Sequence, residues 1–365
     1  MEPSPLHCLA GAAVAAFDRQ ARSYNAPCWS SSRPMYQQAR ETLETLARAD
    51  TGVRSVAAHL ARSPAPREMF HPLVAALHAL RTGPRETAVE RGRHIADGIR
   101  LLYHATDAAL LRPRAPERGG GRRRVHVVIP FRSTAEDSLR PRNLRTCLAG
   151  LARQTGPRAD LTVTVVESDA VPRHRLAVEG RVDRYVFQED GGPFNKARAV
   201  NTGVAATADG GPDDVVCVLD ADIAVDARFI ARIARATPAD GALLPYQDAF
   251  CLDGHSSERL AVLMASERLT GLMDAEAERA PGPWSGYLIR RPPGGCLAVT
   301  RDAFDRVGGF DPRFKGWGGE DRDVVDRLER HARVERAPGL LVHLMHERPP
   351  MRESREEIMN AALRN

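Results

Sequence analysis

The chain has 365 residues, of which 43% are hydrophobic and 27% are charged, and this length allows one large α/β domain plus a smaller one. Its 52 Lys and Arg exceed its 47 Asp and Glu, a modest excess that predicts solubility and non-specific attraction and says nothing of the fold. We expect no nucleic-acid partner, because the acidic motifs described below would repel phosphate. Six scattered cysteines without a CxxC pair argue against a disulfide framework, so we expect reduced and mostly buried thiols.

The apolar stretch at residues 6–17 is too short to span a bilayer. It also lacks the basic segment that precedes the apolar part of a signal peptide. No other long apolar run follows. We therefore expect a cytoplasmic protein without a transmembrane segment.

Residues 1–111 are predicted to form an α-helical N-terminal domain. Apolar residues recur at three- and four-residue spacing within four stretches, 36–49, 53–62, 70–81 and 87–111. These helices are candidates for acceptor recognition, for homo-oligomer formation or for a scaffold, and the sequence does not separate these roles. Residues 112–124 combine Pro, three consecutive Gly and six Arg, which predicts a linker.

Residues 125–350 have a different pattern of apolar residues, which predicts a parallel α/β domain. A helical tail is predicted at 351–365. Continuous β-branched runs at 125–129, 161–166 and 215–219 alternate with helix-like stretches at 143–153 and 195–206. Ligands bind beyond the carboxyl ends of such strands. Polar or conformationally special residues follow each run, namely Pro130-Phe131-Arg132, Glu167-Ser168-Asp169 and Asp220-Ala221-Asp222.

Two motifs predict a metal site. Asp220 and Asp222 bracket a small residue at a strand end, where two carboxylates bind a hard divalent cation; an acidic surface turn is the alternative. His343 and His346 converge on one metal if the backbone turns between them, and surface or core histidines are the alternative. Mixed oxygen and nitrogen ligands suit manganese, with magnesium as the second choice.

A third motif, Gly316-Trp317-Gly318-Gly319-Glu320-Asp321, predicts catalytic chemistry on a sugar. Glycines around a tryptophan leave its face open for stacking on a ring. The two acids fall at the start of a predicted helix at 323–330, and helix capping explains only one of them. A carboxylate beside an aromatic platform is what base catalysis on a hydroxyl requires.

These motifs, in this order, resemble the β-1,4-galactosyltransferases and the related catalytic domains of bacterial chondroitin polymerase and polypeptide N-acetylgalactosaminyltransferases. The motifs that carry the resemblance are Pro130-Phe131-Arg132, Phe194-Asn195-Lys196-Ala197-Arg198, the DxD at 220–222, Gly294-Gly295, the Gly-Trp motif at 316–321 and the final HxxH at 343–346. The resemblance covers about residues 124–350. It implies a GT-A fold, with a mostly parallel sheet flanked by helices, and an inverting, metal-dependent transfer.

The resemblance also implies a role for each matching residue. Residues at the nucleotide-sugar are Pro130, Phe131, Arg132, Glu167, Phe194, Lys196, Asp220 and Ala221. Asp222 and His346 match metal ligands, and His343 stands where the galactosyltransferases have Met. Residues at the acceptor or donor sugar are Trp317, Gly318, Glu320 and Gly295. Asp321 matches the catalytic base, and Lys196 replaces an Arg of the family with a point charge.

The sequence thus predicts a bacterial-type glycosyltransferase that moves a hexose or N-acetylhexosamine from a UDP-sugar to a hydroxyl of a glycan or small natural product. One alternative is a nucleotidyltransferase acting on nucleotide-sugars, which would need a Gly-rich phosphate loop after the first strand. A second is a non-catalytic carbohydrate- or nucleic-acid-binding protein, which gives no reason for adjacent acids beside a metal site. A third is a retaining transferase, which the placement of Asp321 disfavours.

Overall fold

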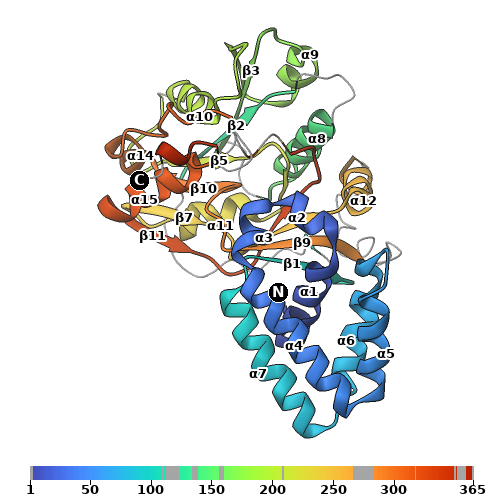
Figure 1. The fold of residues 1–365 in the computed structure, drawn as a ribbon. Helices are drawn as coiled ribbons and strands as arrows, with labels where there is room; N and C mark the ends of the chain where they lie inside the picture. The colour runs from blue at the N-terminus through green and yellow to red at the C-terminus, as the bar shows by residue number, and fades with distance from the viewer. Residues whose placement is uncertain are drawn as a thin grey trace. The chain divides into compact units, whose positions relative to one another are not determined.

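The structure is a computed structural model, and it describes residues 3–108, 110–111, 123–133, 139–155, 160–207, 209–265, 283–316, 318–348, 351 and 359–363. The chain divides into two compact units (Figure 1). Unit 1 consists of Met1–Ala108, Asp248–Ser256 and Ala280–Arg291. Unit 2 consists of Ala109–Gln247, Ser257–Arg279 and Pro292–Asn365.

Unit 1 is built around its first helix. Its helices are α1 (Pro5–Phe17), α2 (Arg19–Tyr24), α3 (Ala26–Ser31), α4 (Arg33–Ala49), α5 (Thr51–Leu60), the 3-10 turn η1 (Pro66–Met69), α6 (Phe70–His78) and α7 (Thr82–Gly98). Helix α1 contacts α4, α6 and α7, and its residues 8–15 are buried. A Cβ at Gly11 would lie 2.1 Å from the Tyr103 carbonyl oxygen, so the helix approaches the neighbouring strand closely. This burial explains the apolar composition of residues 6–17.

Three antiparallel strands complete unit 1: β1 (Leu101–Thr106), β8 (Asp248–Leu252) and β9 (Trp284–Arg290). Strand β9 lies between the other two, with Leu101 opposite Ile289 and Cys251 opposite Tyr287. The prediction of a helix at 87–111 is therefore wrong beyond α7. Strand β1 pairs with a segment far along the chain, and local periodicity does not report such a partner.

Unit 2 contains a seven-stranded sheet in the order β11-β7-β10-β5-β2-β3-β4. Its strands are β2 (Val125–Phe131), β3 (Leu161–Asp169), β4 (Arg184–Glu189), β5 (Val215–Leu219), β7 (Gly241–Leu244), β10 (Cys296–Thr300) and β11 (Arg333–Arg336). The four strands β5, β2, β3 and β4 are parallel, whereas β10 runs antiparallel between β5 and β7. The predicted α/β class with a helical N-terminal region is confirmed, and so are the three strands predicted from β-branched runs.

Strand β6 (Ile223–Ala224) follows the DxD turn directly, and it pairs antiparallel with β12 (Leu340–His343). The further helical elements are α8 (Leu139–Ala152), α9 (Arg175–Val178), η3 (Glu179–Arg181), α10 (Lys196–Ala205), α11 (Phe229–Ala236), α12 (Gly254–Ala265), α14 (Arg301–Arg306), α15 (Glu320–His331) and η5 (Ala361–Leu363). Helix α10 packs tightly on the sheet, since a Cβ at Gly203 would lie 2.4 Å from Val128 Cγ1. Its first residue, Lys196, is thereby fixed near the strand ends.

Among the described helices, none combines the length and the apolar composition needed to cross a bilayer.

Two predicted segments lie largely outside the described residues. Of the linker at 112–124, the structure describes 123 and 124, and Arg123 donates hydrogen bonds to carbonyls at the end of α11. Of the tail at 351–365, it describes 351 and 359–363, where the short turn η5 forms. The predicted domain boundaries stay predictions.

Candidate active site

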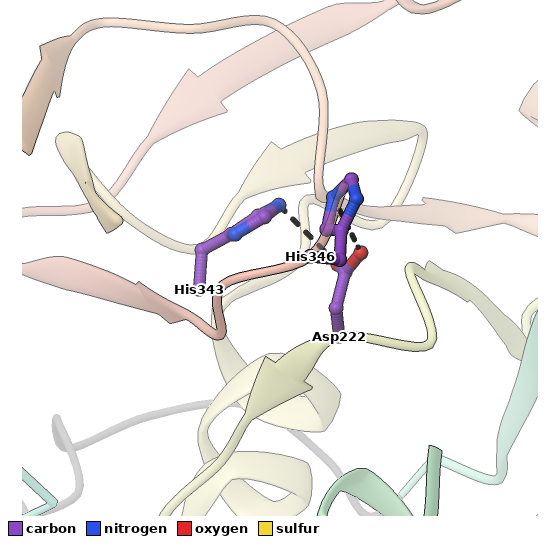
Figure 2. Close-up of side chains that lie close together, drawn as sticks. All are labelled: Asp222, His343 and His346. Atoms are coloured by element: carbon purple, nitrogen blue, oxygen red, sulfur yellow. Dashed lines mark ion pairs between the residues drawn. The ribbon is translucent and has the colours of Figure 1, made fainter. Parts of the chain in front are cut away.

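Asp222, His343 and His346 come together as a candidate metal centre (Figure 2). Pairing of β6 with β12 sets His343 opposite Ile223, and the Leu344 amide donates to the Asp222 carbonyl. His343 Nε2 lies 3.4 Å from Asp222 Oδ1, and His346 Nε2 lies 3.1 Å from Asp222 Oδ2. One ligand atom from each residue falls within 4.8 Å of the others. In the part of the chain that the structure describes, this is the one His/Cys/Asp/Glu group with such spacing.

The hydrogen-bonding pattern of these three residues fits a cation. His346 Nδ1 lies 2.7 Å from the Glu347 carbonyl oxygen, which only accepts, so Nδ1 carries the proton. In the neutral ring, Nε2 is then a lone pair that faces a carboxylate oxygen. His343 Nδ1 and Asp222 Oδ1 are buried without a hydrogen-bond partner. His343 Nε2 and His346 Nε2 face the Asp222 carboxylate, and nitrogen and oxygen donors arranged in this way can hold a divalent metal ion.

The electrostatics of the centre point in the same direction. Burial lowers the pKa of His343 to about 3, so the ring is neutral near pH 7 and keeps a lone pair for a metal. Burial alone would raise the pKa of Asp222, but His343 and His346, where their rings carry a proton toward the carboxylate, outweigh it and hold that pKa well below its ordinary value. The centre therefore offers one carboxylate and two imidazoles, oxygen and nitrogen donors that can bind a divalent metal ion.

A second group, here called the lysine cluster, consists of Lys196, Asp220, Glu320 and Asp321. The Lys196 Nζ lies 2.7 Å from Asp220 Oδ1 and 3.0 and 3.1 Å from the two oxygens of Asp321. Glu320 Oε1 is more distant, at 3.9 Å. Because Asp220 and Asp222 belong to one short turn, the lysine cluster and the metal centre lie next to each other.

Burial raises the pKa of two carboxylates in the lysine cluster, Glu320 and Asp220. Burial and the neighbouring Asp321 raise the pKa of Glu320 to about 8, although Lys196 opposes the shift. Burial likewise raises the pKa of Asp220, against the attraction of Lys196. Burial alone would lower the pKa of Lys196, but the surrounding acids raise it well above its ordinary value. Lys196 is thus a permanent cation.

The Gly294-Gly295 pair forms the wall beside Asp321. A Cβ at Gly294 would lie 2.0 Å from Asp321 Oδ2, so glycine lets this carboxylate approach the backbone. Gly295 has a φ of 102°, and its carbonyl accepts the Asp220 amide. The Tyr246 hydroxyl donates to the Gly294 carbonyl at 2.6 Å. These contacts fix the turn at Gly294-Gly295, which contacts both Asp220 and Asp321.

Arg132 and Phe194 lie together at the carboxyl ends of the parallel strands. The Arg132 guanidinium donates to the carbonyls of Ser168 and Gly192, each at 2.5 Å, and to that of Asp190. It also lies over the Phe194 ring, 5.6 Å from its centroid. Three of its five N–H groups are therefore used by the backbone, so Arg132 holds the loop that leads into α10.

Pro130 and Phe131 end β2, in register with Val166 and Glu167 of β3. Glu167 is buried, and it accepts hydrogen bonds from the Tyr185 hydroxyl at 2.5 Å and from the His174 amide. The His174 ring meets Phe131 edge-on at 5.2 Å. Sequence reasoning missed His174, which lies on a loop without a motif.

The turn before α15 has positive φ angles that favour glycine. Gly316, Gly318 and Gly319 have φ values of 70°, 78° and 108°, in the left-handed region that only glycine adopts readily. The Asn360 side chain donates to the Gly318 carbonyl at 2.9 Å. Trp317 lies outside the described residues, so its stacking role stays a prediction.

The structure thus brings the predicted residues into the metal centre, the lysine cluster and a third group around Arg132, Phe194 and Glu167 at the ends of the parallel strands. Ala221 links the two acids of the DxD turn, and Phe194 lies two residues before Lys196. Sequence reasoning missed Tyr246, although it follows the end of β7 as the other polar groups follow theirs. It also missed Asn143 of α8, which donates to the Met345 carbonyl and supports the segment between the two histidines.

Carboxylates and histidines lie beyond strand ends of the α/β unit, and comparisons with known proteins find sequence similarity to glycosyltransferases. Residues 287–349 match the family model described as the N-terminal domain of galactosyltransferase. The validoxylamine A glucosyltransferase of Streptomyces hygroscopicus subsp. limoneus is 30% identical over 235 residues, which cover 57% of this chain and 48% of the relative. The β-1,4-galactosyltransferase 4 of Rattus norvegicus is 43% identical over 49 residues, 13% of this chain and 14% of the relative.

Among solved structures, the mannosyltransferase PcManGT from Pyrobaculum calidifontis in complex with GDP-Man and Mn²⁺ has a TM-score of 0.39 and 20% identity, over 64% of this chain and 60% of that one. The sequence matches confirm the predicted resemblance and the predicted class of enzyme, a glycosyltransferase, for the matched part of the chain. The chain spans about half the length of the glucosyltransferase that it matches, so its activity as a whole protein is a proposal.

Proposed function

We propose that the chain is an inverting, metal-dependent glycosyltransferase that moves a hexosyl or N-acetylhexosaminyl group from a UDP-sugar to a hydroxyl. The convergence of Asp222, His343 and His346 beside the lysine cluster is the observation that carries this proposal. The names of the relatives, a glucosyltransferase and a galactosyltransferase, support a hexosyl donor. A glycan or small natural product as acceptor and a cytoplasmic location complete the proposal.

The proposed reaction is a single displacement at the anomeric carbon. Asp321 takes the proton of the acceptor hydroxyl as that oxygen forms its bond to the anomeric carbon. The bond from this carbon to the diphosphate oxygen breaks, and the nucleoside diphosphate leaves with the electron pair. One displacement inverts the anomeric configuration.

The chain supplies the ligands for a divalent ion at this point. Asp222, His346 and His343 would hold it, and manganese suits their donor atoms better than magnesium. When bound, the ion offsets the charge that develops on the diphosphate as a Lewis acid. The groups at the strand ends, with Arg132, Phe194 and Glu167, are assigned to the nucleotide. Gly295, Gly318 and Glu320 are assigned to the sugars, together with Trp317.

Thermal unfolding tests the proposal without knowledge of the acceptor. UDP, GDP and ADP are each added with and without MnCl₂. UDP with MnCl₂ is expected to raise Tm most, because the proposed donor is a UDP-sugar. A ligand at 100 times its Kd stabilises the folded protein by about 2.7 kcal/mol. His346→Ala should lose the manganese-dependent part of the shift. His331→Ala, on an exposed histidine at the end of α15, is the matched control and should keep it.

Release of UDP from UDP-glucose, UDP-galactose and their N-acetylated analogues then identifies the donor. Proton NMR of the product should show the anomeric configuration opposite to that of the donor. Retention of configuration contradicts the inverting mechanism. Failure of every uridine nucleotide to stabilise the protein in the presence of manganese contradicts the proposal as a whole.

A further inference from the structure

Lys196 has a position that the resemblance to galactosyltransferases does not explain. The resemblance assigns this residue to the nucleotide, yet its ammonium lies among the carboxylates of Asp220, Glu320 and Asp321. We infer that Lys196 is a positioning residue for Asp321, which holds the base in the orientation that faces the acceptor hydroxyl, and that it is not a ligand of the donor diphosphate. This inference rests on the proposed function.

The hydrogen bonds of Lys196 account for all of its donors. An ammonium has three N–H groups. The three nearest oxygens are Asp220 Oδ1 at 2.7 Å and the two oxygens of Asp321 at 3.0 and 3.1 Å. A phosphate oxygen would gain a hydrogen bond from this side chain only if one of these contacts broke. The side chain is also mostly buried, with 11% of its surface exposed.

The charges around Asp321 make this cation necessary. The groups that face it are Asp220 from the end of β5, Glu320 from its own helix and Tyr246 from the end of β7, besides Lys196 of α10. Burial raises the pKa of the Tyr246 hydroxyl, so this group stays neutral. Among these described neighbours, Lys196 is the one cation. Without it, the carboxylates of Asp220, Glu320 and Asp321 would repel one another at close range.

The geometry also fixes where Asp321 points. Lys196 contacts both carboxylate oxygens, while the Gly294 backbone lies against Oδ2 so closely that a Cβ there would be 2.0 Å away. The two contacts hold the side chain from two directions. An ionised carboxylate has about four lone-pair sites, so each oxygen keeps one for the acceptor hydroxyl. Lys196 therefore positions the base without blocking it.

Lys196→Met separates this role from that of a diphosphate ligand. Calorimetry is expected to give a Kd for UDP with MnCl₂ within about threefold of the wild type, since no phosphate contact is lost. At neutral pH, kcat for the UDP-hexose that the wild type consumes is expected to fall by about 10²-fold. The acidic limb of the pH–rate profile should move up by about one to three pH units.

Lys196→Arg keeps the positive charge, and the acidic limb of its pH–rate profile should lie close to that of the wild type. Arg306→Met removes an exposed cation on α14 that pairs with Asp240 and Asp302, and it should match the wild type in both measurements. A Kd for UDP that rises tenfold or more in Lys196→Met, with an unchanged limb, would overturn the inference and make Lys196 a diphosphate ligand.

Thermal unfolding gives a readout that is independent of activity. The loss of Tm in Lys196→Met is expected to be larger at pH 8 than at pH 5, because Glu320, whose pKa is raised to about 8 by burial, is protonated at pH 5 and adds less negative charge there. If Lys196→Met does not fold, the double variant Lys196→Met/Asp321→Asn should fold, since both charges are absent. A pH-independent loss of Tm contradicts the inference even where the wild type binds UDP, whereas a wild type that binds no uridine nucleotide contradicts the proposed function alone.

Discussion

Gly294→Ala is the sharpest test of the proposed base, because it acts on one side chain. The new Cβ would lie 2.0 Å from Asp321 Oδ2 and 2.7 Å from its Cγ. The φ of Gly294 is outside the left-handed region, so alanine fits the backbone. An ordinary contact needs 3.4–4 Å, and even a tight one needs 3.0 Å, so the carboxylate must move by at least about 1 Å, since packed atoms do not interpenetrate.

A displacement of this size has a large effect on catalysis and a small one on folding. Misplacement of a reacting group by about 1 Å costs on the order of 10²-fold in rate, or about 2.7 kcal/mol of activation free energy. Replacement of Gly by Ala at a compatible backbone stabilises by about 0.4–1 kcal/mol through the unfolded chain. We therefore expect kcat to fall by about two orders of magnitude while Tm stays within a few degrees of the wild type.

The assay follows UDP release under saturating donor, with Tm and the Kd for UDP with MnCl₂ measured in parallel. Gly180→Ala is the matched control, because nothing lies within 4 Å of a Cβ at that position, and it should leave all three quantities unchanged. A Gly294→Ala enzyme with normal kcat would show that Asp321 is not the base or is not held at this place. A collapse of Tm would instead show that the substitution acts through the backbone.

Two further predictions concern stability. The pKa of Glu320 is raised by burial from 4.5 to about 8. The contribution of its protonated form to the free energy of unfolding is therefore fully present below pH 4.5 and is lost as pH rises through 8. Glu320→Gln should therefore gain stability relative to the wild type between pH 5 and pH 8.5, by on the order of 1–3 kcal/mol; a Tm difference that does not grow with pH contradicts this. In unit 1, Arg290 Nη1 lies 2.6 Å from Asp248 Oδ2 in a buried pair. Asp248→Asn should lower the free energy of unfolding by about 3–5 kcal/mol in chemical denaturation, whereas Glu179→Gln, in an exposed pair with Arg175, should change nothing measurable; equal effects would refute the role of burial.

The position of the site was predictable because parallel strands end at one edge of a sheet. The β-branched runs of β2, β3 and β5 are local signals, and the polar residues after them follow directly in the sequence. Tyr246 satisfies the same criterion after β7, but that strand has only four residues, Gly241–Leu244. Its short apolar run carries no distinctive period.

The partners of these residues were not predictable, because they depend on contacts between distant segments. Lys196 meets Asp321 across 125 positions of the chain, and no local pattern indicates that pairing. Strand β1 has the same limitation, since its register is set by β9. The resemblance supplied a role for Lys196, whereas the structure supplied its neighbours.

The DxD turn shows what the folded chain adds to a motif. Asp220 and Asp222 have one small residue between them, yet they belong to different groups. Asp222 faces two imidazoles, which lower its pKa against the effect of burial, whereas burial raises the pKa of Asp220 despite the Lys196 ammonium. The opposite shifts arise because the strand pair β6–β12 brings histidines to one acid and helix α10 brings a lysine to the other. The two acids of one motif therefore have different neighbours, and the short backbone between them keeps the candidate metal centre and the lysine cluster adjacent.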